Sequence, residues 1–346
     1  MDLVPPEIWT RILSQACTDA GETGRSLSLV SKFIQNASAR VKLQSLAAHG
    51  PQQVFALEDL LRRTPPHLRR VRNLYLSHTS FPSSTHLSTE TGHPSLPEGN
   101  YRDARLKQAA EKKKLAAACC RIFQVVAESI EVLYLDGRGT FDFGDSPPII
   151  FPRLKELTSN GLPFRESSGD RGTMSRTGVF PKLHRWHLMT YPRRSKPDPF
   201  TSITTLAPAI THLRFSNLEQ EPFFPSDLKV ALNIAVPWQP SSHARTRSSR
   251  VGFHPPISPI GRLPSSIQYV YVKPAAPPTP GGMCGTPVLS YRSLIGGLEV
   301  LRKSDSRIVL LPSYDSYWEA RCTSSDWEDR INGGDGCWSL REQITS

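Results

Sequence analysis

The sequence predicts an α/β fold, in which an N-terminal helical module is followed by an irregular solenoid of helix-and-strand repeats. Two observations carry this prediction. The first 48 residues contain two amphipathic helical patterns, and a short strand phrase of the form x-x-L-x-L then recurs along the chain. Helical stretches precede several of these strands, at 103–127, 202–207, 226–235 and 289–302. Stacking such units gives one parallel sheet with its helices on the outer face.

The first helix is expected to begin at Pro5 and Pro6, because proline suits the first helical turn. Apolar residues follow at helical spacing, at Ile8, Trp9, Ile12, Leu13 and Ala16. Gly21 and Gly24 interrupt the pattern, and a second helical set then occupies 27–37. The sequence thus predicts two short helices with a glycine-bearing turn.

This module is too small for its own hydrophobicity. Chains below about 50 residues seldom bury enough apolar surface to be stable alone, and both helices are apolar on more than one side. Either the rest of the chain covers the remaining surface or a partner protein does, since exposed apolar patches commonly mark interfaces.

Several stretches carry a family resemblance. Pro5-Pro6-Glu7-Ile8-Trp9, then Ile12-Leu13 and Leu29-Val30-Ser31-Lys32, are similar to the F-box. The segments 24–34, 41–50 and 329–338 resemble a family of fungal F-box-like proteins. The resemblance implies docking on the Skp1-like adaptor of an SCF-type ubiquitin ligase, and through it on a cullin, while the remainder holds an unknown protein substrate. The residues that match the docking positions are Pro5, Pro6, Ile8, Ile12, Leu29, Val30 and Ile34.

The sequence departs from this pattern at one place. Many F-boxes carry a Trp shortly after the Val-Ser-Lys step, where this chain has Phe33 and Ile34. An aliphatic side chain buries less area than an indole ring. The alternative is therefore a non-catalytic repeat scaffold whose F-box-like head packs on its own first repeats and no longer recruits a ligase.

The strand phrases follow the helical module with spacings of about 25 to 30 residues where no insert intervenes, which resembles a degenerate leucine-rich repeat. They lie at 71–76, 130–135, 154–157, 183–188, 210–215, 267–272 and 308–311. The leucines of each phrase should face the helices, and the intervening side chains should line an exposed concave face. The predicted substrate-face residues are Tyr75, Tyr134, Trp186, Arg214, Tyr269 and Tyr271, because aromatic and Arg side chains are common in binding hot spots. Equally, these aromatics could be ordinary cross-strand pairs.

The sequence divides into three parts: an F-box-like module at 1–48, a repeat region at 49–312 and a capping tail at 313–346. Segments near 79–100, 167–177 and 237–264 are rich in Ser, Pro, Gly or Arg and are expected to be flexible inserts. The tail is rich in aromatic residues, among them Trp327 and Trp338. We expect it to cover the open end of the last repeat.

Composition narrows the function classes. The net charge of +11 suggests nucleic-acid binding. However, the basic clusters near 102–114 and 245–250 have no interleaved aromatic residues on which bases could stack. Nucleic-acid binding is therefore the third hypothesis, after the adaptor and the scaffold. No apolar run approaches the ~20 residues that span a bilayer. The six cysteines lack C-x-x-C spacing. We expect an intracellular protein, cytoplasmic or nuclear, that binds no membrane.

The sequence offers no catalytic set. His184 and His187 form H-x-x-H, but residues three apart on a strand face opposite sides and cannot share a metal ion. Gly137 and Gly139 follow a strand without the spacing of a dinucleotide site, and the acidic residues at 326–329 fit a solvated turn. We expect no enzyme activity, cofactor or metal.

Overall fold

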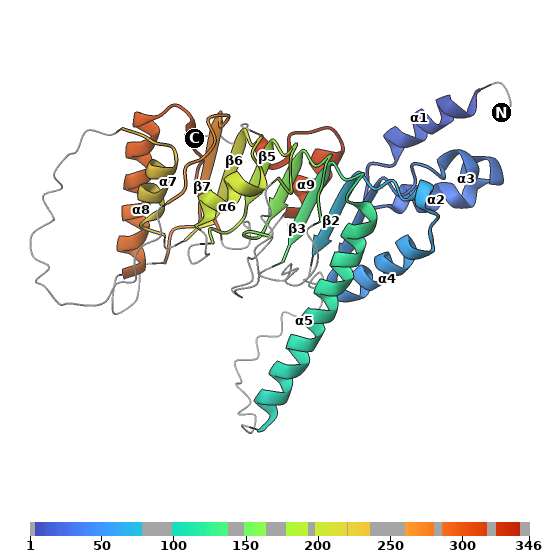
Figure 1. The fold of residues 1–346 in the computed structure, drawn as a ribbon, viewed down its shortest axis with the longest axis horizontal. Helices are drawn as coiled ribbons and strands as arrows, with labels where there is room; N and C mark the ends of the chain where they lie inside the picture. The colour runs from blue at the N-terminus through green and yellow to red at the C-terminus, as the bar shows by residue number, and fades with distance from the viewer. Residues whose placement is uncertain are drawn as a thin grey trace, which may run out of the picture.

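The computed structural model describes residues 4–77, 99–137, 149–163, 178–192, 198–219, 221–235, 260–279, 286–316 and 323–339. Within these ranges the chain forms an α/β fold built on one eight-stranded parallel sheet (Figure 1). No helix in the described ranges is long and apolar enough to cross a membrane. The predicted inserts fall almost entirely outside the described residues.

The N-terminal module, here called the head, contains three helices rather than two. They are α1 (Pro6–Ala16), α2 (Glu22–Val30) and α3 (Lys32–Ser38). The predicted second helix is split at Ser31, whose backbone is extended and whose hydroxyl accepts a hydrogen bond from the Ile34 amide at 3.2 Å. A serine in this position caps a new helix, so the chain changes direction there.

The strands follow one another across the sheet in chain order, all parallel. They are β1 (Ser45–His49), β2 (Asn73–Ser77), β3 (Val132–Asp136), β4 (Glu156–Ser159), β5 (Arg185–Leu188), β6 (His212–Leu218), β7 (Tyr269–Pro274) and β8 (Ile308–Leu310). Seven of them overlap the predicted phrases. β1 was not predicted, and the predicted boundary at residue 48 falls inside it.

One face of the sheet, here called the helix face, is covered by helices. They are α4 (Gly50–Arg63), α5 (Gly99–Val126), α6 (Pro199–Leu206), α7 (Phe224–Ala231) and α8 (Thr286–Ser304), with the short 3-10 helix η1 (Pro66–Leu68) between α4 and β2. The four predicted helical stretches are confirmed as α5 to α8. Figure 1 shows α8 at one end of the molecule and the head at the other.

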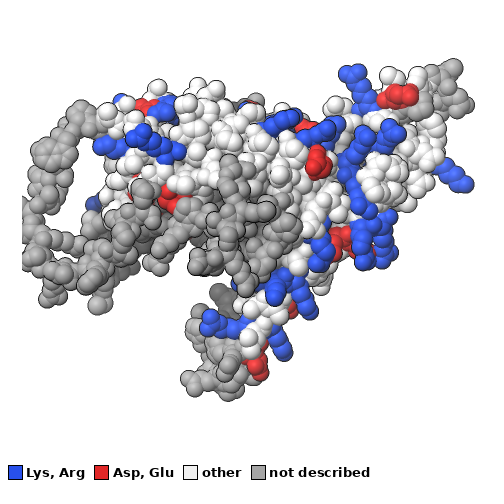
Figure 2. Space-filling model, in the orientation of Figure 1, with Lys and Arg blue, Asp and Glu red and all other residues white. Residues whose placement is uncertain are grey.

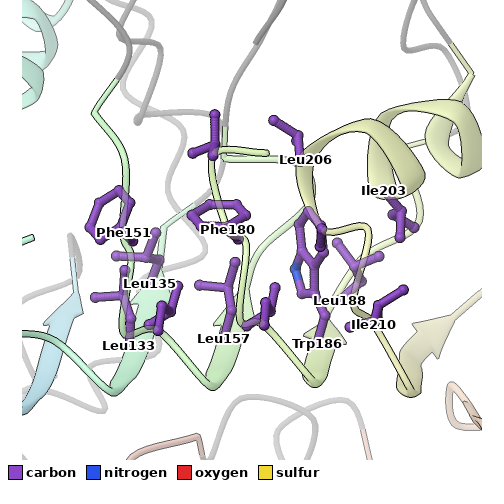
Figure 3. Packing of buried hydrophobic residues seen from close by; sticks show 14 of the residues in the cluster. Leu133, Leu135, Phe151, Leu157, Phe180, Trp186, Leu188, Ile203, Leu206 and Ile210 are labelled. Atoms are coloured by element: carbon purple, nitrogen blue, oxygen red, sulfur yellow. The ribbon is translucent and has the colours of Figure 1, made fainter. Parts of the chain in front are cut away.

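The main hydrophobic core lies between the sheet and these helices. Leu74, Leu133 and Leu157 occupy one row across the neighbouring strands β2, β3 and β4, and all are at most 2% exposed. Where no helix covers β4 and β5, loop residues complete the core. Figure 3 shows the rings of Phe151 and Phe180 above these strands, with ring centroids 5.6 Å apart.

The opposite face of the sheet, here called the tail face, is covered by the C-terminal segment. This segment contains α9 (Thr323–Ile331) and the 3-10 helix η3 (Gly336–Trp338). Trp327 packs with Tyr75 and Tyr134 at one side, while Trp338 packs with Tyr271 and Leu311 at the other. The described part of the tail therefore runs across the sheet face and also packs against Leu311 and Val309 at the last strand.

Candidate protein-interaction site

The head exposes a set of large apolar side chains. Ile8 and Ile12 on α1 are 46% and 52% exposed, and Leu29 and Val30 at the end of α2 are 83% and 66% exposed. Phe33 is 37% exposed. We call these five residues the docking patch. Pro5 is also exposed, and the side chain of Pro6 lies outside the description.

Internal contacts hold the docking patch in place. Leu13 and Cys17, on the other side of α1, are buried. Trp9 meets Phe33 edge to face, with ring centroids 6.1 Å apart, which ties α1 to α3. The patch is therefore formed by packed helices. These helices carry apolar residues on two sides, and the rest of the chain covers only one of those sides, so the other side stays exposed.

Ile34 differs from the other predicted docking residues because it is buried, with 6% of its surface exposed. Ile34 is the third residue of α3 and faces into the head, whereas Phe33 beside it remains at the surface. The structure thus brings Ile8, Ile12, Leu29 and Val30 to the surface and removes Ile34 from it.

The gap between α1 and the sheet is bridged by Gln44. Its side-chain amide nitrogen donates to the carbonyl oxygens of Ser14 and Cys17, the latter at 3.1 Å. Its amide oxygen accepts from the Ser14 hydroxyl at 2.9 Å. These bonds hold the C-terminal half of α1 against the start of β1.

The predicted substrate-face residues do not form an exposed surface. Tyr75, Tyr134, Arg214 and Tyr271 face the tail as expected for that side of the sheet, but each is at most 7% exposed because the tail covers it. Tyr269 alone is 43% exposed. The expectation of an open binding face is wrong for the four covered residues. Tyr75 and Tyr134 are cross-strand neighbours, with ring centroids 6.4 Å apart.

Trp186 lies on the helix face instead. It pairs in register with Leu157 and Leu213 and is fully buried. Figure 3 shows its ring among core residues, and its Nε1 donates to Ser159 Oγ at 3.0 Å. The prediction failed because the strand phrase at 183–188 was placed one residue out of phase, which exchanges the two faces.

Polar contacts anchor the tail on the sheet. Arg330 Nε lies 2.7 Å from Glu156 Oε2, and Arg214 donates to the Cys337 carbonyl oxygen. The ring of Trp327 lies 5.6 Å from that of Tyr75 with the two planes tilted by 55°, and Trp338 meets Tyr271 edge to face at 5.9 Å between ring centroids. The sequence analysis did not predict the Glu156–Arg330 ion pair or the packing of the two tryptophans on the sheet. The aromatic residues of the tail did indicate that it packs on another part of the chain.

Burial under the tail shifts the pKa of the covered titratable groups. Burial, reinforced by the nearby Arg214, lowers the pKa of His187 well below its ordinary value, so the imidazole is neutral. Burial raises the pKa of Tyr134 well above its ordinary value and raises that of the Cys337 thiol to about 12. These groups are held in their uncharged forms at neutral pH.

The H-x-x-H pair does not converge on one point. His184 is exposed, and its Nδ1 lies 3.2 Å from the Ala209 carbonyl oxygen. His187 is buried, and its Nε2 lies 2.8 Å from Ser216 Oγ. Within the part of the chain that the structure describes, no group of three His, Cys, Asp or Glu side chains could hold a metal ion.

Comparisons with models of protein families, with curated proteins and with solved structures found no match to this chain.

Proposed function

We propose that this chain is an F-box-type substrate-recognition adaptor that docks on a Skp1-like protein, and through it on a cullin, in an SCF-type ubiquitin ligase. The single observation that carries the proposal is the exposed docking patch. Ile8, Ile12, Leu29 and Val30 match the docking positions implied by the sequence resemblance, and each is at least 46% exposed. Association with a partner would remove these apolar side chains from water.

The sheet would be the degenerate leucine-rich-repeat-like solenoid of this adaptor. Eight parallel strands in chain order, with helices gathered on one face, are what stacked strand-and-helix units produce. A target would then be held on surfaces that the tail leaves open, such as the region of Tyr269. The mechanism needs no chemistry in this chain, because holding a target near a ligase raises its effective concentration.

The docking proposal is tested with the double variant Ile8→Asp/Ile12→Asp. Two carboxylates in the docking patch would have to be desolvated on association, so binding of a purified Skp1-like protein should fall at least about tenfold. The matched control is Leu289→Asp/Val300→Asp, which changes two apolar residues of α8 that are 63% and 54% exposed at the far end of the molecule. It should bind like the unchanged chain.

Circular dichroism and the thermal midpoint of both variants report whether the fold is kept. Full binding by the folded Ile8→Asp/Ile12→Asp variant would contradict the docking proposal, as would equal losses in both variants.

The alternative is a repeat scaffold whose head does not recruit a ligase. The burial of Ile34 favours it, together with the packing of Phe33 on Trp9 near the place where many F-boxes carry a Trp. If the unchanged chain binds neither the Skp1-like protein nor a cullin through it, the scaffold function replaces the adaptor function.

A further inference from the structure

A polar groove lies where the head meets the sheet. It consists of two adjoining cavities of about 300 Å³ each, which share Ser14, Gln15, Gln44 and Arg72 in their walls. We call it the junction groove. One cavity extends along the amino ends of the strands to Glu156 and Arg330, and the other extends between α1 and the segment before β1.

Cations predominate along the junction groove. Arg11, Arg40 and Arg70 line the cavity beside α1, and all three are exposed. Among the described residues, none of these three arginines forms an ion pair. Figure 2 shows Lys and Arg side chains gathered around this junction, with few Asp and Glu between them. Glu7 is the one acidic residue in the wall of this cavity, so the three guanidinium groups leave it with a net positive charge that favours anions.

The cavity that extends along the sheet is lined by both cationic and anionic side chains. Lys155 and Arg72 stand at its rim, where both approach Glu131, Lys155 at 2.7 Å and Arg72 at 3.9 Å. Glu156 lies deeper, with 2% of its side chain exposed. Its Oε2 is bonded to Arg330, while its buried Oε1 accepts no hydrogen bond from the described residues. Glu156 is therefore part of the wall and closed to a ligand, and the accessible carboxylate on this side is that of Glu131, which is 29% exposed.

We propose that the junction groove binds an acidic peptide segment of a partner protein. Its carboxylates would pair with Arg11, Arg40 and Arg70, and its backbone N–H groups would face the carboxylates of Glu7 and Glu131 in the same walls. A peptide is the occupant that offers spaced carboxylates and backbone donors on one extended chain. The proposal does not depend on the adaptor function.

A nucleic acid fits the groove less well. None of the residues that line the two cavities is aromatic, so the groove has no side chain on which bases could stack. Glu7 and Glu131 also stand in its walls, where they would repel a continuous run of phosphates, whereas a peptide can place its neutral backbone N–H groups there and its carboxylates at the arginines.

The test measures fluorescence anisotropy of a short labelled peptide of alternating Glu and Gly with the full chain at about 0.1 M salt, where charges more than about 10 Å away are screened. The charge-reversal variant Arg11→Glu/Arg40→Glu/Arg70→Glu should weaken binding at least about tenfold, and a Gln-Gly peptide should bind neither protein. The matched control is Arg292→Glu/Arg302→Glu/Lys303→Glu on α8, which makes the same change in net charge at the other end of the molecule. It should change the affinity less than about twofold, because rim charges far from a site act only weakly.

Equal losses in the two triple variants would mean that net charge alone attracts the peptide, and the proposal would be wrong. It would also be wrong if inorganic phosphate displaced the peptide at an equal concentration of charge, which indicates a simple anion site. Tighter binding of a single-stranded oligonucleotide through the same arginines would replace the peptide by nucleic acid. The uncharged variant Ile8→Asn/Ile12→Asn removes apolar side chains of the docking patch without adding charge beside Arg11 and should bind the peptide normally, so this test and that of the docking patch fail independently.

Discussion

Arg330 of α9 places its Nε 2.7 Å from Oε2 of Glu156 in β4, and so joins the C-terminal tail to the middle of the sheet. The Glu156 side chain is 2% exposed and that of Arg330 is 29% exposed. Burial by itself would lower the pKa of Arg330, but the Glu156 carboxylate outweighs that effect and raises it. The tail therefore supplies the closest cationic partner of the buried Glu156 side chain.

We expect Arg330→Met to lower the free energy of unfolding by about 2–4 kcal/mol, because it leaves the buried Glu156 charge without its main partner. Arg185, whose Nη1 lies 3.9 Å from the same oxygen, softens the effect. The double variant Arg330→Met/Glu156→Gln should be less destabilised than Arg330→Met, since no buried charge remains. Urea unfolding of both variants measures the difference, and equal losses would show that the ion pair is not what matters.

Replacement by alanine should have opposite effects on stability at two glycines, Gly24 and Gly296. A Cβ on Gly24 of α2 would overlap the carbonyl group of Lys42, whereas a Cβ on Gly296 of α8 would meet nothing within 4 Å. Gly24→Ala should thus destabilise the head by about 1–3 kcal/mol through overpacking. Gly296→Ala should stabilise the chain by about 0.5–1 kcal/mol, because alanine loses less backbone entropy in a helix. Thermal unfolding of the two variants checks the opposite signs, and a shift in the same direction would contradict the packing around Gly24.

Seven strands and the four helices α5 to α8 could be predicted from the sequence because each carries its own local pattern. The phrase Val71 to Leu76, for example, combines β-branched or aromatic residues with alternating leucines, which favours a half-buried strand. β1 escaped prediction because Ser45-Leu-Ala-Ala-His49 contains no β-branched or aromatic hydrophobic residue. Its strand structure comes from pairing with β2.

The covering of the tail face could not be predicted, because it depends on contacts between distant parts of the chain. Arg330 and Glu156 are 174 residues apart in sequence. The aromatic residues of the tail indicate that it must pack on an apolar surface, but they do not specify which one. The exposed surface of the head was easier to predict than the position of the tail, because the exposure of Ile8 and Ile12 follows from the two apolar sides of α1.

The cysteines of the described residues should resist modification in the native protein. Cys17, Cys119, Cys120 and Cys337 are free and buried. Burial raises the pKa of Cys119 to about 12, with a smaller contribution from Cys120. Because the thiolate is the reactive form, these thiols should not react with a thiol reagent near pH 8 until the chain unfolds.

The experiment uses the Cys284→Ser/Cys322→Ser variant, since these two cysteines lie outside the described residues. All four remaining thiols should react in concentrated urea and none rapidly without it. Fast modification of one thiol in the native protein would show that the segment covering it opens readily.

His187 should make the protein less stable as the pH falls. Its pKa is depressed in the folded state by burial and by Arg214, whereas the unfolded chain binds a proton near the ordinary value of about 6.5. Below that pH the unfolded state holds more protons than the folded state, so the free energy of unfolding decreases by up to about 1.4 kcal/mol per pH unit. Above it both states are neutral at this position and the contribution is constant.

The variant His187→Gln removes the titratable imidazole and keeps a side chain that can hydrogen-bond to Ser216. Its free energy of unfolding should vary less between about pH 7 and pH 5 than that of the unchanged chain. A smaller slope should remain, because burial also lowers the pKa of His49 and His212. Urea titrations at a series of pH values measure both slopes. Identical slopes would mean that His187 is protonated in the folded protein, which its burial beside Arg214 opposes.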